Sequence, residues 1–177
     1  RFPEPGETVT NAVVSRFPGG KGGNQAVAAH RLGARVFMIA CTGQDAAAED
    51  ALRTLREEGV NLDYCQAIAG VSTGLAMILV SASGENQIVV APGANAAFHA
   101  GLLNFPATDA LIAQLEVPMD TILKATQGKT GFFCLNAAPA KPVPASVLAH
   151  VDLLIVNEIE ARDIGDQLAD FKGMLAT

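Results

Sequence analysis

Hydrophobic and polar positions along the chain follow two patterns, continuous apolar runs and helical stripes. Apolar runs over ARVFMIACTG (34–43), DALIAQLEV (109–117), GFFCLNAAPA (131–140) and VDLLIVNE (151–158) predict buried strands. Helical periodicity predicts helices at 24–32, 45–58, 119–128 and 145–150. Because strands and helices alternate, we expect an α/β fold with a doubly wound, mostly parallel sheet flanked by helices.

The helix predicted at 45–58 has the clearest end signals. Asp45 is a candidate N-cap, and Gly59 is a candidate stop. Between them, Ala48, Leu52 and Leu55 form an apolar stripe at helical spacing. The pattern therefore indicates a helix that packs one face on the sheet.

Residues 71–95 follow a different pattern. Two apolar segments flank Ser83-Gly84-Glu85-Asn86, which has good turn chemistry, and this predicts a β-hairpin. The β-branched stretch ETVTNAVVSR (7–16) predicts one or two further exposed strands. These segments lie outside the strand–helix rhythm. We expect a small β-sheet lid of residues 7–18 and 71–94, beside an α/β core of residues 19–70 and 95–177.

Composition and charge exclude several classes of function. The chain has 177 residues, of which 50% are hydrophobic and 17% charged, so it is globular rather than disordered. A net charge of −6 with no basic run disfavours nucleic acid as a partner. No apolar run approaches the length of a membrane span, so we expect no membrane partner. Cys41, Cys65 and Cys134 are widely spaced without a CxxC motif, which favours a reduced, cytoplasmic setting.

The stretch FPGGKGGNQAVAAHRLGA (17–34) concentrates glycine around Lys21. Glycine costs roughly 0.5–1 kcal/mol relative to alanine in regular structure, so the cluster needs a reason. Either the backbone requires positive φ, or a ligand approaches it closely. A Walker A loop fails here, because Gly22 stands where Ser or Thr is needed. A dinucleotide fingerprint fails because Gln25 holds the place of its third glycine.

The spacing resembles another motif. It runs Gly19-Gly20-x-Gly22-x-Asn24-x-Ala26, then six residues to Gly33 and nine to Gly43. This is similar to the N-terminal signature of the ribokinase-like carbohydrate kinases. RFPEPGET, GVSTGLAMILV, GENQIVVAPGANAAF, QLEVP, LNAAPA and VNEIEA follow in the family's order, so nearly the whole chain is covered. GGKGGNQA, QLE and NAAPA resemble the ribose kinases more than the fructokinases or nucleoside kinases.

The resemblance implies a sugar site. It assigns sugar hydroxyls to the glycine cluster and to a carboxylate at the end of a buried strand. The residues concerned are Gly19, Gly20, Lys21, Gly22, Gly23, Asn24 and Glu116. Two alternatives stay open: the glycines only satisfy turn geometry, and Glu116 is a helix-capping or salt-bridged carboxylate.

A nucleotide site is implied in the same way. Asn157 and Glu160 in VNEIEA match an Asn-x-x-Glu element that positions magnesium and phosphates, with Glu160 reaching Mg²⁺ through water. Asn136 in LNAAPA is placed near the triphosphate, although Ala137 stands where the family usually has proline. The alternative for Asn157 is a helix start with a capping asparagine.

The implied reaction is ATP-dependent phosphorylation of a sugar hydroxyl, with ribose giving ribose 5-phosphate. ATP and Mg²⁺ are the implied cofactors, with K⁺ as a further candidate, and a homodimer through the β lid is the implied assembly. The alternatives are a kinase for another sugar or a nucleoside, and a non-catalytic sugar-binding relative or fragment. The family's general-base aspartate lies in a Gly-Ala-Gly-Asp motif that these 177 residues do not contain. We therefore assign no catalytic residue, and expect the chain to be inactive alone and part of a longer protein.

Overall fold

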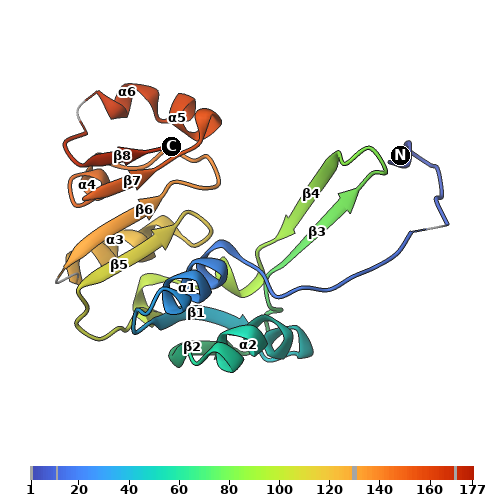
Figure 1. Ribbon diagram of the computed structural model, residues 1–177, viewed down its shortest axis with the longest axis horizontal. Helices are drawn as coiled ribbons and strands as arrows, with labels where there is room; N and C mark the ends of the chain where they lie inside the picture. Colours follow the sequence, from blue (N-terminus) through green and yellow to red (C-terminus); the bar gives the residue numbers. More distant parts are fainter. Residues whose placement is uncertain (1, 11, 129–130, 170) are drawn as a thin grey trace.

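A computed structural model describes residues 2–10, 12–128, 131–169 and 171–177 (Figure 1). The helices are α1 (Lys21–Arg31), α2 (Ala46–Glu58), α3 (Met119–Gly128), α4 (Ala145–Leu148), α5 (Glu158–Asp163) and α6 (Gly165–Leu168), with short 3₁₀ turns η1 (Gly93–Asn95) and η2 (Ala100–Leu102). The strands are β1 (Phe37–Gly43), β2 (Asn61–Ile68), β3 (Leu75–Val80), β4 (Asn86–Ala91), β5 (Ala110–Gln114), β6 (Phe132–Asn136), β7 (Leu153–Ile155) and β8 (Met174–Ala176). The predicted α/β class, with parallel strands and flanking helices, is confirmed.

The parallel strands of the described residues form two sheets. β1 pairs with β2, and β5, β6, β7 and β8 pair in that order. Gln114 of β5 lies opposite Asn136 of β6, which lies opposite Ile155 of β7. The carboxyl ends of these three strands therefore meet at one edge of the sheet. The segments that contain Glu116, Asn136 and Asn157 start from that edge, where open α/β sheets bind their ligands.

The main hydrophobic core joins the four-stranded sheet to the helices beside it. Phe133, Leu135 and Leu154 supply its strand side chains, and each is 0% exposed. Val147 of α4 and Ile122 of α3 pack on them. Burial of one such side chain contributes about 1.5–3 kcal/mol, so this layer holds β5–β7 rigidly. A smaller cluster around Ala26 and Leu55 packs α1 and α2 over the first sheet.

The ends of α2 agree with the sequence. Asp45 Oδ1 accepts a hydrogen bond from the Ala48 N–H at 3.0 Å, and Gly59 ends the helix with φ of 88°. Asp45 also accepts from the hydroxyl and the N–H of Thr73, at 2.6 and 2.8 Å. These two hydrogen bonds lower the pKa of the Asp45 carboxyl. The cap of α2 thus also holds the chain where it leaves for the hairpin.

The hairpin is attached at the end of β1, where Gly43 contacts the first residues of the hairpin segment. The Gly43 N–H donates to the Thr73 hydroxyl at 2.9 Å, and the Ala94 N–H donates to the Ser72 carbonyl at 2.8 Å. A Cβ on Gly43 would lie 2.4 Å from the Val71 carbonyl oxygen, so only glycine allows this approach. We call residues 71–74 and 92–94, with Gly43, the hairpin root.

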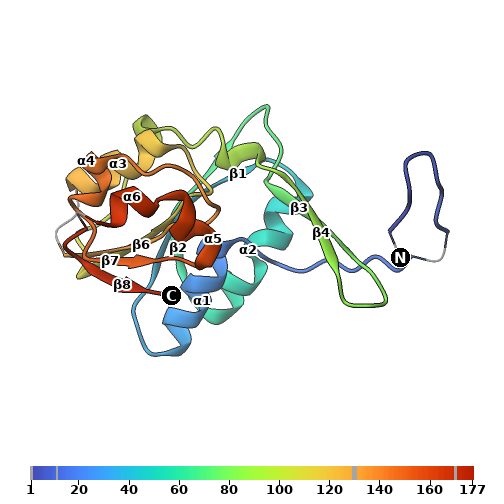
Figure 2. The same ribbon diagram turned by 90° about the horizontal axis from the view of Figure 1, so that it is seen from above.

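The predicted hairpin is confirmed. β3 and β4 pair antiparallel from Leu75 opposite Ala91 to Val80 opposite Asn86. The turn closes with the Ser81 N–H donating to the Glu85 carbonyl at 2.9 Å. Figures 1 and 2 show the hairpin extending away from the α/β body. Every position of both strands is exposed, so neither face contributes to the core.

The strands predicted within residues 7–16 are wrong. The described residues 7–10 and 12–16 form no strand, while Asn11 lies outside the described residues. Val13 and Val14 are 92% and 84% exposed, with no strand beside them among the described residues. β-branched residues favour a strand only where a partner receives their hydrogen bonds and side chains. The β layer of the described chain therefore consists of the hairpin alone.

Candidate functional site

The helix that follows the glycine cluster begins inside it. α1 starts at Lys21, three residues before the predicted start at Asn24. Gly20 is its N-cap with φ of 83°, a left-handed conformation that favours glycine. No side chain of its own caps this helix end. The amino end of α1 therefore presents N–H groups that need partners from elsewhere.

The glycines of the cluster are needed for different structural reasons. Gly20 satisfies the turn, whereas Gly22 permits a close approach: a Cβ there would lie 3.1 Å from Gln114 Oε1. Gly19 and Gly23 have no heavy atom within 4 Å of the corresponding position. Two of the four glycines thus have internal reasons, and two face open space beside the backbone.

Glu116 meets the amino end of α1. Its Oε2 accepts a hydrogen bond from the Lys21 N–H at 3.2 Å, although the two residues are 95 positions apart in the sequence. The side chains of Gln114 and Gln25 are hydrogen bonded beside it. A carboxylate is favoured at a helix N-terminus by the partial positive charge there. The structure therefore joins the two segments assigned to sugar, through a contact that also has the form of a helix cap.

Asn24 occupies a different part of this region. Its side chain is exposed and lines a hollow of about 350 Å³ together with Gly19 and Gly23. The opposite wall is α2, through Thr54 and Leu55. Asn24 therefore lies on the α2 side of the glycine cluster, whereas Glu116 is hydrogen bonded to the Lys21 N–H.

Asn157 and Glu160 form a capping box at the start of α5. Asn157 Oδ1 accepts from the Ile159 and Glu160 N–H groups at 2.9 Å, and Glu160 Oε2 accepts from the Asn157 N–H at 2.8 Å. Glu160 is only 8% exposed. The hydrogen bonds of both side chains are therefore those of a helix cap, which is the alternative expected for Asn157. Asn136 ends β6 one strand away, at the same edge of the sheet.

Metal ligands are sparse in the described part of the chain. Within it, no group of three or more His, Cys, Asp or Glu side chains could hold a metal ion. One Glu160 oxygen is already committed to the Asn157 N–H. Among the described residues, Asn157 and Glu160 therefore form no cage of direct metal ligands.

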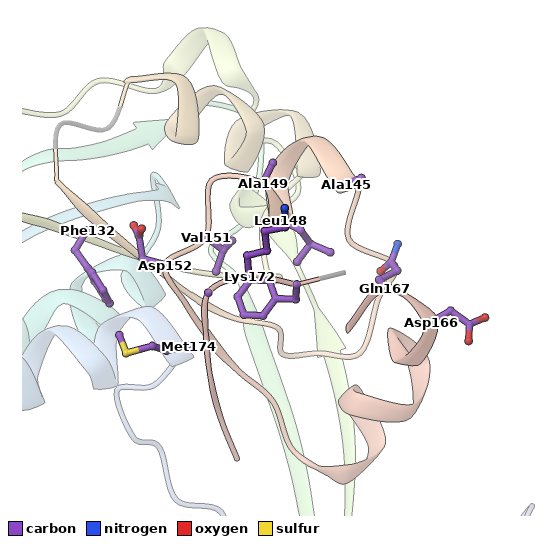
Figure 3. Close-up of a pocket in the computed structure, with 12 residues that line it drawn as sticks. Phe132, Ala145, Leu148, Ala149, Val151, Asp152, Asp166, Gln167, Lys172 and Met174 are labelled. Atoms are coloured by element: carbon purple, nitrogen blue, oxygen red, sulfur yellow. The ribbon is translucent and has the colours of Figure 1, made fainter. Parts of the chain in front are cut away.

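A larger hollow than the one beside Asn24 lies at the other edge of the sheet. It has a volume of about 1000 Å³ and is lined by Phe132 and Met174, the first residues of β6 and β8. Figure 3 shows these two side chains with Val151, Asp152 and Lys172 around it. None of the predicted sugar and nucleotide residues is among the residues that line this hollow.

The sequence did not point to two residues that make contacts near Glu116 and the amino end of α1. Lys141 Nζ donates to the Leu115 carbonyl oxygen at 2.7 Å, and Gln114 packs against Gly22 and Gln25. Gln114 lies in the QLE segment and Lys141 directly follows NAAPA, so position near the end of a strand was the available signal.

Across the residues described, no helix has the length and apolar character needed to cross a membrane.

Comparisons with known proteins show the family and the fold. The pfkB family of carbohydrate kinases matches residues 1–170, and the chain belongs to that family. It is 36% identical to a ribokinase of Haemophilus influenzae, over 96% of this chain and 58% of that protein. A Thermotoga maritima ribokinase structure superposes with a TM-score of 0.87 at 29% identity, over 97% of this chain and 59% of the other. A Cryptococcus neoformans ribokinase in complex with ADP gives 0.75 at 31% identity, over 97% and 56%. The chain thus spans somewhat more than half the length of these relatives.

Proposed function

We propose that the protein carrying this chain transfers a phosphoryl group from ATP to a sugar hydroxyl, with ribose as the substrate and ribose 5-phosphate as the product. One observation carries the proposal: the Glu116 carboxylate meets the amino end of α1 within the glycine cluster. This unites two distant segments that resemble the sugar-binding elements of the family. Membership of the pfkB family and similarity to ribokinases support the same reaction.

The proposed chemistry follows from the groups at the carboxyl edge. A sugar has many hydroxyls, and each needs a partner when it leaves water. The N–H groups of the first turn of α1, Lys21 and Glu116 offer donors and acceptors for them, and Asn24 offers both from the α2 side of the glycine cluster. Phosphoryl transfer depends chiefly on positioning and charge stabilisation. Asn136 lies opposite Gln114 of β5, and Asn157 follows β7, which supports a nucleotide region next to Glu116 at this edge of the sheet. We assign ATP and Mg²⁺ to that neighbouring region, with Glu160 acting through water.

A substrate panel tests the proposal directly. Purified protein is mixed with ATP, Mg²⁺ and one candidate acceptor at a time, and ADP release is measured with and without K⁺. The candidates are ribose, 2-deoxyribose, fructose and a nucleoside. We expect the highest kcat/KM with ribose. A higher value with another acceptor would support the kinase of different specificity, and calorimetric ribose binding without ADP release would support the non-catalytic relative.

The exposed hairpin supports a second proposal, a homodimer. Ile78 and Ile88 are paired on one face, and Met77 and Val89 on the other, each 56–59% exposed. A second copy of the hairpin would bury one of these faces. We expect sedimentation velocity to show a dimer. Two double variants test which face is used: Ile78→Lys with Ile88→Lys, and Met77→Lys with Val89→Lys. One of them should raise the dissociation constant of the dimer at least about tenfold, and the other should not. A monomer at all concentrations contradicts the proposal.

A further inference from the structure

The loop that follows β6 holds the residue before Glu116 by both of its main-chain polar groups. Lys141 Nζ donates to the Leu115 carbonyl oxygen at 2.7 Å, and the Leu115 N–H donates to the Ala138 carbonyl oxygen at 2.9 Å. The Leu115 side chain is 0% exposed in the core. The pairing of β5 with β6 ends at Gln114, so these two contacts extend the attachment beyond the strands.

The held carbonyl sets the direction of Glu116. The Leu115 C=O and the Glu116 N–H belong to one planar peptide, so fixing the oxygen fixes the plane from which Glu116 departs. Glu116 Oε2 then accepts from the Lys21 N–H at 3.2 Å. A continuous series of contacts thus runs from Lys141 to the amino end of α1.

The chemistry of Lys141 suits this task. Its ammonium group has three donors and no acceptor, and one donor is used on the Leu115 oxygen. The residue as a whole is exposed, so its side chain is not required to fill the core. Removing the ammonium group would leave the Leu115 oxygen to water and release the peptide plane, while the buried Leu115 side chain would keep the fold together.

We propose that Lys141 is a positioning residue of the sugar site, which locks the Leu115–Glu116 peptide so that the Glu116 carboxylate is held at the amino end of α1. The inference rests on the proposed function, because it gives Glu116 its role toward sugar. It adds a residue from the loop after β6 to a site otherwise built from α1 and the end of β5. The effect is on ground-state sugar binding, through Glu116.

Kinetics of three variants test the proposal in the protein that carries this chain. We expect Lys141→Met to raise the KM for ribose about fivefold with kcat within about twofold, since a hydrogen bond that only orients the binding group is lost. Lys141→Arg should restore the KM, because it keeps a charged donor. Lys124→Met, at an exposed lysine of α3, is the matched control and should behave as wild type. In a Glu116→Ala background, Lys141→Met should add no further loss.

Amide exchange gives a readout that needs no catalysis. Lys141→Met should speed hydrogen–deuterium exchange at the Lys21 amide, whose acceptor is Glu116, and Lys124→Met should not. Unchanged exchange and KM in Lys141→Met would overturn the proposal, as would a loss of kcat at constant KM. If wild-type protein phosphorylates no sugar, the proposed function fails, while exchange still tests the positioning of Glu116. Lys141→Gln replaces Lys141→Met if the latter does not fold, with the same expected results.

Discussion

Replacement of Glu116 by alanine is expected to raise the KM for ribose about a hundredfold, because loss of a hydrogen-bonding charged group costs up to about 3 kcal/mol. Glu116 is half-buried and already directed at the amino end of α1. The change removes an acceptor for sugar hydroxyls together with the partner of the Lys21 N–H. Initial rates over a range of ribose concentrations, at saturating ATP, measure the effect.

Two further variants separate binding from capping. Glu116→Gln keeps an oxygen for the Lys21 N–H but loses the charge, and its KM should fall between wild type and Glu116→Ala. Glu57→Ala, at an exposed glutamate of α2, is the control. If Glu116→Ala lowers the thermal midpoint but leaves the ribose KM unchanged, Glu116 is only a helix cap.

Asn24→Ala should also raise the KM for ribose. Unchanged sugar kinetics in both Asn24→Ala and Glu116→Ala would refute the sugar site.

Replacement of Gly43 by alanine is expected to lower the free energy of unfolding by about 3 kcal/mol, at the upper end of the usual cost of overpacking. The added Cβ would lie 2.4 Å from the Val71 carbonyl oxygen and 2.7 Å from the Thr73 nitrogen. Both neighbours are main-chain atoms, so no side chain can rotate away to relieve the contact. Urea unfolding of wild type and variant measures the difference.

Gly165→Ala is the matched control for this change. Gly165 begins α6, has no heavy atom within 4 Å of its Cβ position, and lacks positive φ. Alanine there should leave stability equal or slightly higher, because it favours helix over glycine. Equal stability of Gly43→Ala and wild type would show that the hairpin root adapts without cost.

Local chemistry made part of the fold predictable. Asp45 and Gly59 end α2 as predicted, and the turn chemistry of Ser83, Gly84 and Glu85 falls within the turn that joins β3 to β4, because in each case the deciding contacts lie within a few residues. The start of α1 was predicted three residues late. A run of glycines disfavours a helix, and the group that meets its first N–H is Glu116, 95 positions away. The segment at 7–16 failed for the opposite reason: strand propensity without a neighbouring strand.

The candidate site was likewise predictable only in part. The glycine spacing and QLE pointed to Gly20, Gly22 and Glu116, which the structure does bring into one region. Lys141 was missed because its partner is a backbone carbonyl, and such an acceptor leaves no trace in residue identity. β2 and β8 were also missed. Polar residues interrupt NLDYCQAI, and β8 has only three residues.

The construction of the hairpin root has a consequence for how the protein can diversify. Its contacts combine the side chains of Thr73 and Asp45 with close approaches between main-chain atoms, as at Gly93, where a Cβ would lie 2.3 Å from the Ser72 oxygen. Side chains along β3 and β4 take no part in the core. Mutations there leave the folding energy of the body nearly untouched. Relatives that change acceptor or assembly are therefore expected to accumulate their differences in these two strands, while the glycines at their base stay fixed.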